Sequence, residues 1–203
     1  MASESNEQEE IEVVKFTGYH GTNAANEASI VENNFRATNN RDLWAGNGVY
    51  FFFFFLRNPI NHAEDWVTTH SWNKNEKAYR YLDYIVLEAE ILADDDKILD
   101  LTVDDGVVLC NKFCDKMIDV KKKKKKRLTN RDYRDTDVIE LMKRKIGLEV
   151  VKGHFYVRFA EQRIGDIRSN IPNSTFISVL TPKDVINKES INVVVRKTID
   201  EKS

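Results

Sequence analysis

Two short segments, about thirty positions apart, carry residue types that can grip a flat ring bearing an amide group. The first is Tyr19-His20-Gly21-Thr22, and the second is Gly46-Asn47-Gly48-Val49-Tyr50-Phe51. Glycine lets a ligand approach the backbone, where an N–H and a C=O can pair with a carboxamide. Histidine can hydrogen-bond a ribose hydroxyl, and tyrosine offers a face for stacking. Together these groups predict a site for the nicotinamide riboside half of NAD.

At these residues the chain resembles the ADP-ribosyltransferases of the diphtheria-toxin and poly(ADP-ribose) polymerase type. Their first two signature positions are a strand-borne His followed by Gly, and a Tyr in a Gly-x-Gly-x-Tyr-Phe strand. The resemblance extends over about residues 14–55 and includes a short helix over 25–33, with Ala28 and Ile30 turned inward. It implies NAD as co-substrate, no metal, and an α+β fold with a split two-sheet core and flanking helices. The residues that it implies for catalysis and NAD binding are His20, Gly21, Thr22, Gly48 and Tyr50.

The third signature residue of this type of enzyme is missing. Relatives that build chains of ADP-ribose carry a Glu early in a late strand, and its carboxylate orients the acceptor. The matching segment here, 174–180, holds no acid, and the equivalent position is Thr175 or Phe176. The departure fits either transfer of a single ADP-ribose or an inactive fold kept for binding. A further possibility is that Glu140 or Glu161 reaches the site from elsewhere.

Composition predicts one globular domain. Hydrophobic residues make up 41% of the 203 residues, enough for a core. Residues 1–10 are acidic and polar and are expected to form a flexible tail, with a single domain over 11–203. The start lacks the features of a signal peptide, no apolar run is long enough to cross a membrane, and Cys110 and Cys114 share one helical face. A cytoplasmic location is therefore expected.

Short strands with a few helices between them predict the α+β class. Alternating or continuous apolar residues predict strands at 11–16, 49–56, 83–92, 148–159, 174–180 and 191–195. Asn58-Pro59 predicts the start of a helix that continues to about Trp72. Further helices are predicted for the apolar stripe Val107, Cys110, Phe113, Cys114 and Met117, and for 137–146, closed by Gly147.

A basic insertion over about 121–134 concentrates positive charge in a chain whose net charge is only −2. It holds nine Lys and Arg residues: Lys121, Lys122, Lys123, Lys124, Lys125, Lys126, Arg127, Arg131 and Arg134. A cluster this dense attracts polyanions, with counterions released for each phosphate that it neutralises. Lys121 to Arg127 are therefore candidate RNA- or DNA-binding residues, although such a run is more often a solvated surface.

The leading functional hypothesis is a mono-ADP-ribosyltransferase that moves ADP-ribose from NAD to a macromolecular acceptor, either protein or nucleic acid. Such an enzyme is typical of toxins and antiviral defence, which would imply a cognate inhibitor or antitoxin as partner. The alternative is a catalytically inactive module of the same fold that binds NAD, ADP-ribose or nucleic acid. RNA 2′-phosphotransferases also show a His-Gly-Thr, but the chain lacks a clear set of their arginines.

Overall fold

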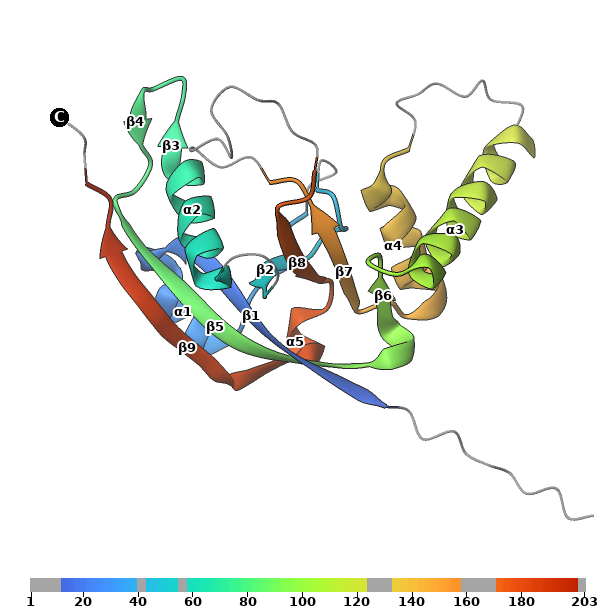
Figure 1. The fold of residues 1–203 in the computed structure, drawn as a ribbon, viewed down its shortest axis with the longest axis horizontal. Helices are drawn as coiled ribbons and strands as arrows, with labels where there is room; N and C mark the ends of the chain where they lie inside the picture. The colour runs from blue at the N-terminus through green and yellow to red at the C-terminus, as the bar shows by residue number, and fades with distance from the viewer. Residues whose placement is uncertain (1–11, 40–42, 55–57, 124–132, 158–170, 201–203) are drawn as a thin grey trace, which may run out of the picture.

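The computed structural model describes residues 12–39, 43–54, 58–123, 133–157 and 171–200 (Figure 1). They form an α+β fold built on a mixed seven-stranded sheet in the order β6-β7-β8-β2-β1-β5-β9, with a two-stranded hairpin β3-β4 beside it. Within the large sheet β6 and β7 are parallel, and the other neighbouring pairs are antiparallel. The predicted α+β class is confirmed. Apart from the β3-β4 hairpin, the described strands form one continuous sheet, which differs from the split two-sheet core that the resemblance implied.

The strands are β1 (Val13–Asn23), β2 (Val49–Phe53), β3 (Trp72–Asn73), β4 (Ala78–Tyr79), β5 (Asp83–Asp94), β6 (Ile98–Asp100), β7 (Val150–Phe155), β8 (Ser174–Val179) and β9 (Ile186–Thr198). The helices are α1 (Glu27–Asn33), α2 (Pro59–Ser71), α3 (Asp104–Lys123), α4 (Asp135–Ile146) and α5 (Pro182–Val185), with 3-10 turns η1 (Ala24–Asn26) and η2 (Asp95–Lys97). Among the described residues, no helix is long and apolar enough to span a membrane.

The large sheet has two halves that meet where β1 lies beside β2. Strands β1, β5 and β9 form one half, and β2, β8, β7 and β6 form the other (Figure 1). Across the junction the register joins a single pair, Tyr19 with Phe52, whereas β1 pairs with β5 along its whole length. On the side of Thr22 and Gly48 no further register pair joins the two strands, and His20, Thr22, Gly48 and Tyr50 of the two motifs lie on that side.

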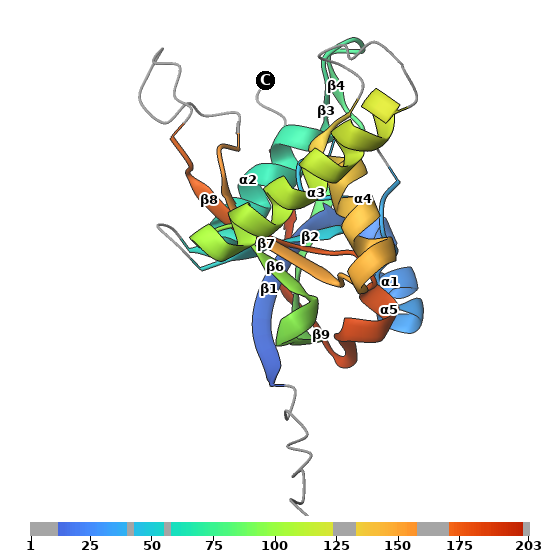
Figure 2. The ribbon, with the colours of Figure 1, turned by 90° about the vertical axis from the view of Figure 1, so that its right-hand side faces the viewer.

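Two hydrophobic clusters cover the two faces of the sheet. The first cluster contains alternate residues of β5, as predicted, namely Ile85, Leu87, Ala89 and Ile91, together with Val49 and Phe51 of β2. The second cluster contains Val86 of β5 and Phe52 of β2, packed with side chains of α2, α3 and α4. Figure 2 shows α1 and α5 near each other at the lower right, below α4 in this view. Asn34, the residue after α1, donates to the Pro182 and Ile186 carbonyls.

Helix α2 begins as the sequence predicts. The Asn58 side chain accepts a hydrogen bond from Ile60 N at 2.9 Å, and Pro59 occupies the first turn. The buried face of α2, with Ala63 and Val67, then packs close to β1. A Cβ on Gly21 would lie 2.2 Å from the Ala63 carbonyl oxygen, so only glycine permits this approach.

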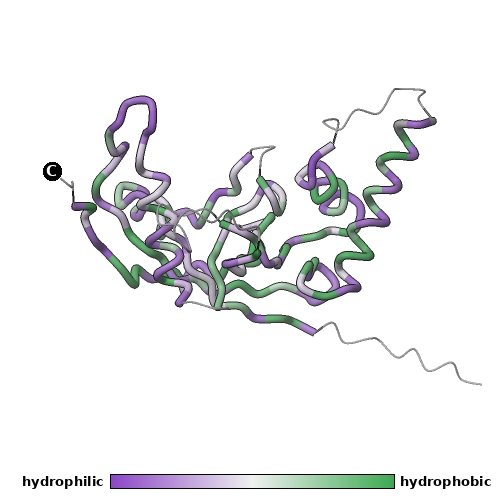
Figure 3. The backbone as a smooth tube through the Cα atoms, turned by 45° about the horizontal axis from the view of Figure 1, so that its top comes forward, coloured by the Kyte–Doolittle hydropathy of each residue, from purple (hydrophilic) through white to green (hydrophobic). Residues whose placement is uncertain are grey.

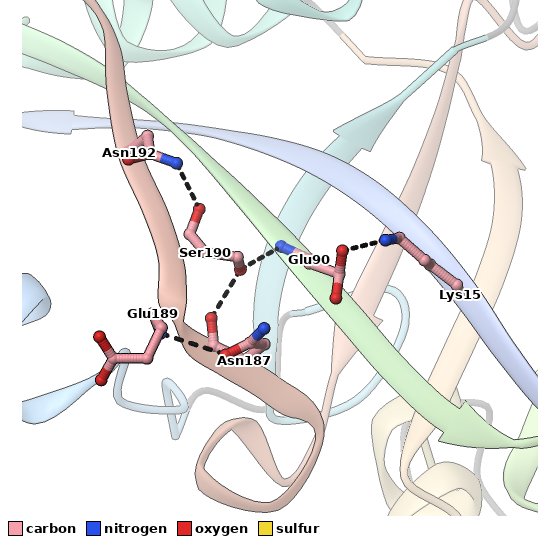
Figure 4. A network of polar contacts seen from close by, with 6 residues as sticks. All are labelled: Lys15, Glu90, Asn187, Glu189, Ser190 and Asn192. Atoms are coloured by element: carbon pink, nitrogen blue, oxygen red, sulfur yellow. Dashed lines mark hydrogen bonds and ion pairs between the residues drawn. The ribbon is translucent and has the colours of Figure 1, made fainter.

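The pairing of β5 with β9 is irregular near Glu90, and side chains replace part of the ladder (Figure 4). Glu90 N donates to the Ser190 hydroxyl at 2.8 Å, and that hydroxyl donates to the Asn187 carbonyl at 2.6 Å. The Glu90 carboxylate pairs with Lys15 of β1. The network connects three strands across the register shift.

Most predicted elements are present, with some corrections. The predicted strand at 11–16 is part of a longer strand, because β1 continues through the His20 motif to Asn23. The helix expected over 25–33 is a 3-10 turn followed by α1; Ile30 is half-buried, but Ala28 is exposed, so its inward orientation was a wrong prediction. The strand predicted at 191–195 belongs to the much longer β9.

Candidate functional site

A cavity of about 620 Å³ lies at the junction of the two half-sheets and contains residues from both sequence motifs. Its walls come from β1, α1, the connection between α1 and β2, the start of β2, and α2. The lining residues are His20, Thr22, Asn26, Ser29, Ile30, Asn34, Phe35, Arg36, Thr38, Leu43, Trp44, Gly48, Val49, Tyr50 and Trp66. Of the sequence-predicted residues, His20, Thr22, Gly48 and Tyr50 therefore line one cavity.

The His20 ring bridges the two strands beyond their last register pair. Its Nδ1 lies 2.8 Å from the Tyr50 carbonyl oxygen, which can only accept, so Nδ1 carries the proton. The ring also packs edge-on against Phe35, with ring centroids 5.3 Å apart. Burial lowers the pKa of His20, partly offset by this hydrogen bond. In the neutral ring Nε2 is an acceptor, which suits a ligand hydroxyl.

The Tyr50 hydroxyl is committed to the turn that precedes β2. It donates to the Gly46 carbonyl and accepts from Ala45 N, both at 2.9 Å. Burial raises the pKa of Tyr50 to about 12, so the phenol stays protonated at neutral pH. Tyr50 can therefore present a ring face in the cavity, while its hydroxyl fixes the turn.

The turn itself needs glycine at two points. Gly46 has φ +80°, a region that residues with a side chain rarely adopt, and a Cβ there would lie 2.5 Å from the Ile139 Cγ2 atom of α4. A Cβ on Gly48 would lie 2.3 Å from the Ser178 hydroxyl of β8. Gly48 and Gly21 thus serve close packing within the protein, a different reason from the ligand approach predicted for glycines in these motifs.

Aromatic side chains crowd the part of the site around Tyr50. Trp44 and Trp66 line the cavity, and both also line a smaller cavity of about 20 Å³ beside Gly21, together with Tyr50 and Phe176. The Tyr50 and Phe176 ring centroids are 5.1 Å apart, and Phe176 stacks on Phe155 at 4.2 Å. This end of the site is suited to a flat ring.

The lining from the end of β1, η1, α1 and the segment after α1 carries polar side chains beside the apolar Ile30 and Phe35. Thr22, Asn26 and Ser29 lie there, and Asn26 Nδ2 donates to the Thr22 hydroxyl at 2.9 Å. Arg36 and Thr38 add a guanidinium and a third hydroxyl to those of Thr22 and Ser29. Arg36 is exposed and is the cation among the described lining residues, which include no carboxylate. Such a lining favours an anionic, hydroxyl-bearing ligand.

The two residues at the missing carboxylate position have different surroundings. Thr175 is buried and its hydroxyl lies 2.9 Å from His154 Nδ1, and it is not among the residues that line the large cavity. The Phe176 ring packs against the Tyr50 ring at an angle and lines the small cavity. The Glu140 carboxylate accepts from Asn47 N at 3.3 Å, behind the glycine turn. Glu161 lies outside the described residues.

The basic insertion is described only at its ends. Helix α3 includes positions 121–123, and Lys122 is exposed with its Nζ 3.9 Å from Asp119. Lys124, Lys125, Lys126 and Arg127 lie outside the described residues, so the nucleic-acid prediction for the cluster stays a prediction. At the other end Thr136 of α4 hydrogen-bonds the Leu43 carbonyl, which places the start of α4 beside the cavity wall.

Sequence reasoning missed Trp44, Trp66 and Arg36 as cavity residues. Trp66 lies within the helix that Asn58-Pro59 predicts, where an aromatic residue is typical of packing. Trp44 and Arg36 lie in the connection between the motifs, which has no periodic pattern. The length of that connection was the available signal, because long loops in compact domains are often functional.

No family model matches the chain, and no curated protein matches it significantly in sequence. Among the described residues, no cluster of His, Cys, Asp and Glu could hold a metal ion.

Proposed function

We propose that the protein is an NAD-dependent mono-ADP-ribosyltransferase acting on a macromolecular acceptor. The observation that carries the proposal is the hydrogen bond of 2.8 Å between His20 Nδ1 and the Tyr50 carbonyl, which joins the two motif residues in the wall of one cavity. The motifs on which the resemblance to ADP-ribosyltransferases rests thus meet in three dimensions, although thirty positions separate them in the chain.

The two ends of the cavity suit the two chemical parts of NAD. The aromatic end, with Tyr50, Trp44 and Trp66, offers faces for a nicotinamide ring. The polar end offers the Arg36 guanidinium for a diphosphate and the Thr22 and Ser29 hydroxyls for ribose. The volume of about 620 Å³ is within the range of sites that enclose ligands of this size, roughly 300–1,000 Å³.

In the proposed reaction the bond between ribose C1 and the ring nitrogen of NAD breaks, and nicotinamide leaves with the bonding electron pair as a neutral molecule. His20, held by Tyr50, accepts a hydrogen bond from a ribose hydroxyl through Nε2. Tyr50 keeps the ring in place, and the fixed groups favour the positively charged sugar that develops. The acceptor attacks C1 from the opposite face, loses a proton, and inverts the configuration.

The polar groups of the described lining favour transfer of one ADP-ribose over chain growth. The lining contains no carboxylate that could orient the 2′-hydroxyl of an attached ADP-ribose as the next acceptor. Thr175 and Phe176, at the position of the missing acid, are both 2% exposed. The same absence supports the second candidate, a module that binds NAD without catalysis.

The experiment is incubation of the purified chain with radiolabelled NAD and a cell extract, followed by separate protease and nuclease digestion. We expect labelled macromolecules that lose their label to one of the two treatments, which identifies the acceptor class. Tyr50→Ala should strongly reduce labelling, and Trp72→Ala, an exposed aromatic outside the cavity lining, should not. Binding of NAD without labelling or nicotinamide release would favour the inactive module. A role as a toxin or in defence requires that the protein transfers ADP-ribose in this assay.

A further inference from the structure

A groove of about 560 Å³ runs between α3 and α4, separate from the cavity at the sheet junction. Its apolar lining consists of Phe113, Met117, Val120, Leu141 and Ile146. Two of these side chains are well exposed, Val120 at 52% and Ile146 at 41%. Figure 3 shows hydrophobic and hydrophilic stretches alternating along α3, as expected for an amphipathic helix. The two helices therefore leave an apolar strip open between them.

The charged residues among the described lining of this strip have one sign. Lys116, Arg144 and Lys145 line the groove, and its described lining includes no Asp or Glu. Lys116 Nζ lies 4.6 Å from the centre of the Phe113 ring, so the charge is held over the apolar floor. Two acids of α3 near the groove, Asp115 and Asp119, are not part of its lining, and Asp119 lies beside Lys122. A ligand in the groove thus meets apolar contacts at its centre and cations at its rim.

We propose that this groove binds an acidic, amphipathic peptide segment of a partner protein. Apolar side chains at the spacing of one helical face would fill the strip, and flanking Asp or Glu would pair with Lys116, Arg144 and Lys145. A nucleic acid would use the cations but leave the apolar floor without a matching surface. The proposal does not depend on NAD binding, because the groove and the junction cavity share no lining residue.

The test is selection of a displayed library of random 16-residue peptides on the full chain. Enriched peptides are measured by fluorescence anisotropy against wild type, Arg144→Glu/Lys145→Glu and Ile146→Asp. The control variant, Lys183→Glu/Lys188→Glu, changes the net charge equally at exposed positions of α5 and β9. We expect enriched peptides with net negative charge and apolar residues three and four apart. Each groove variant should weaken their binding at least tenfold, and the control should not.

Three results would overturn the proposal. The first is enrichment of peptides with no bias in charge, or peptides that bind the groove variants and the control alike. The second is a single-stranded RNA 20-mer that binds wild type, loses its affinity in the groove variants and displaces the peptides. The third is competition by a synthetic peptide of residues 1–12, which would assign the groove to the acidic segment of the chain itself. Circular dichroism of each variant checks that it folds.

Discussion

His20 and Tyr50 support each other through backbone and ring, and each has a distinct physical task. His20 Nδ1 donates a hydrogen bond to the Tyr50 carbonyl and so links β1 to β2 beyond their last register pair. The Tyr50 hydroxyl is used on the Ala45–Gly46 turn and leaves only the ring for a ligand. The two residues therefore shape the cavity as well as line it.

Replacing Tyr50 with Phe should destabilise the protein although the ring remains. The change leaves Ala45 N–H and the Gly46 carbonyl without their partner, and one buried unsatisfied group costs about 1–3 kcal/mol. The free energy of unfolding from urea titration measures the loss. Tyr79→Phe, in the β3-β4 hairpin, is the matched control, and equal stability of the two variants would contradict the assigned role of the Tyr50 hydroxyl.

His20 should make stability fall as pH drops below about 6.5, the unperturbed histidine pKa. Burial lowers the pKa of the folded state, so in this window the unfolded chain binds more protons. The stabilisation is full above the unfolded pKa and is lost progressively until the pH reaches the lower, folded pKa. Melting temperatures of wild type and His20→Asn from pH 8 to pH 5 test this. His70, whose pKa is also lowered by burial, is common to both proteins. Parallel curves would contradict the claim.

At the scale of elements, the turn before β2 and its contact with α4 hold the cavity wall in place. Gly46 packs on Ile139, Thr136 hydrogen-bonds the Leu43 carbonyl, and Glu140 accepts from Asn47 N. Helix α4 therefore positions the 43–48 segment from behind, on the side away from the groove that it forms with α3.

Gly46→Ala should cost more stability than Gly147→Ala. Both residues have positive φ, so both substitutions carry the strain of a left-handed backbone, about 1–2 kcal/mol. Only at Gly46 would the new Cβ also meet a buried side chain, 2.5 Å from Ile139 Cγ2, whereas nothing lies within 4 Å at Gly147. Overpacking of this kind adds roughly 1–3 kcal/mol. Thermal or urea unfolding of the pair decides, and a smaller loss for Gly46→Ala would be inconsistent with the packing described.

The sequence predicted elements whose signals are local. Asn58-Pro59 marks the start of α2, Gly147 ends α4, and the alternation in β5 assigns its buried face, because caps and periodicity depend on neighbouring residues. The apolar pattern alone did not predict that β1 passes through two glycines. The reason is tertiary: a Cβ on Gly18 would lie 2.6 Å from Phe51 Cβ, and Gly21 makes room for α2.

The residues of the candidate site also divide into those with a local sequence signal and those without one. His20 and Tyr50 could be predicted because each lies in a short motif, and the cavity contains both. Trp44, Trp66 and Arg36 could not, since they reach the cavity from α2 and from the connection before β2, and no local pattern encodes how these segments come together. The carboxylate expected of chain-building relatives is missing from the sequence, and the described lining supplies no substitute.

For the molecule as a whole, we expect attachment of single ADP-ribose units without polymer. Growth needs a group that orients the 2′-hydroxyl of an attached unit, and Thr175 and Phe176 are buried side chains that cannot act as a carboxylate. A denaturing gel of products formed with labelled NAD should show discrete bands. Ladders of increasing mass, lost on treatment with an enzyme that degrades poly(ADP-ribose), would refute the expectation.

The most direct test of the central claim, that the junction cavity binds NAD, is calorimetric titration of NAD into wild type, Tyr50→Ala and the control Trp72→Ala. We predict one binding site in wild type and in the control. Loss of the Tyr50 ring should cost roughly 1–3 kcal/mol, the scale of one aromatic stacking contact, which is about a 5- to 150-fold weaker Kd. Equal affinity of wild type and Tyr50→Ala, or no binding by wild type, would contradict the account.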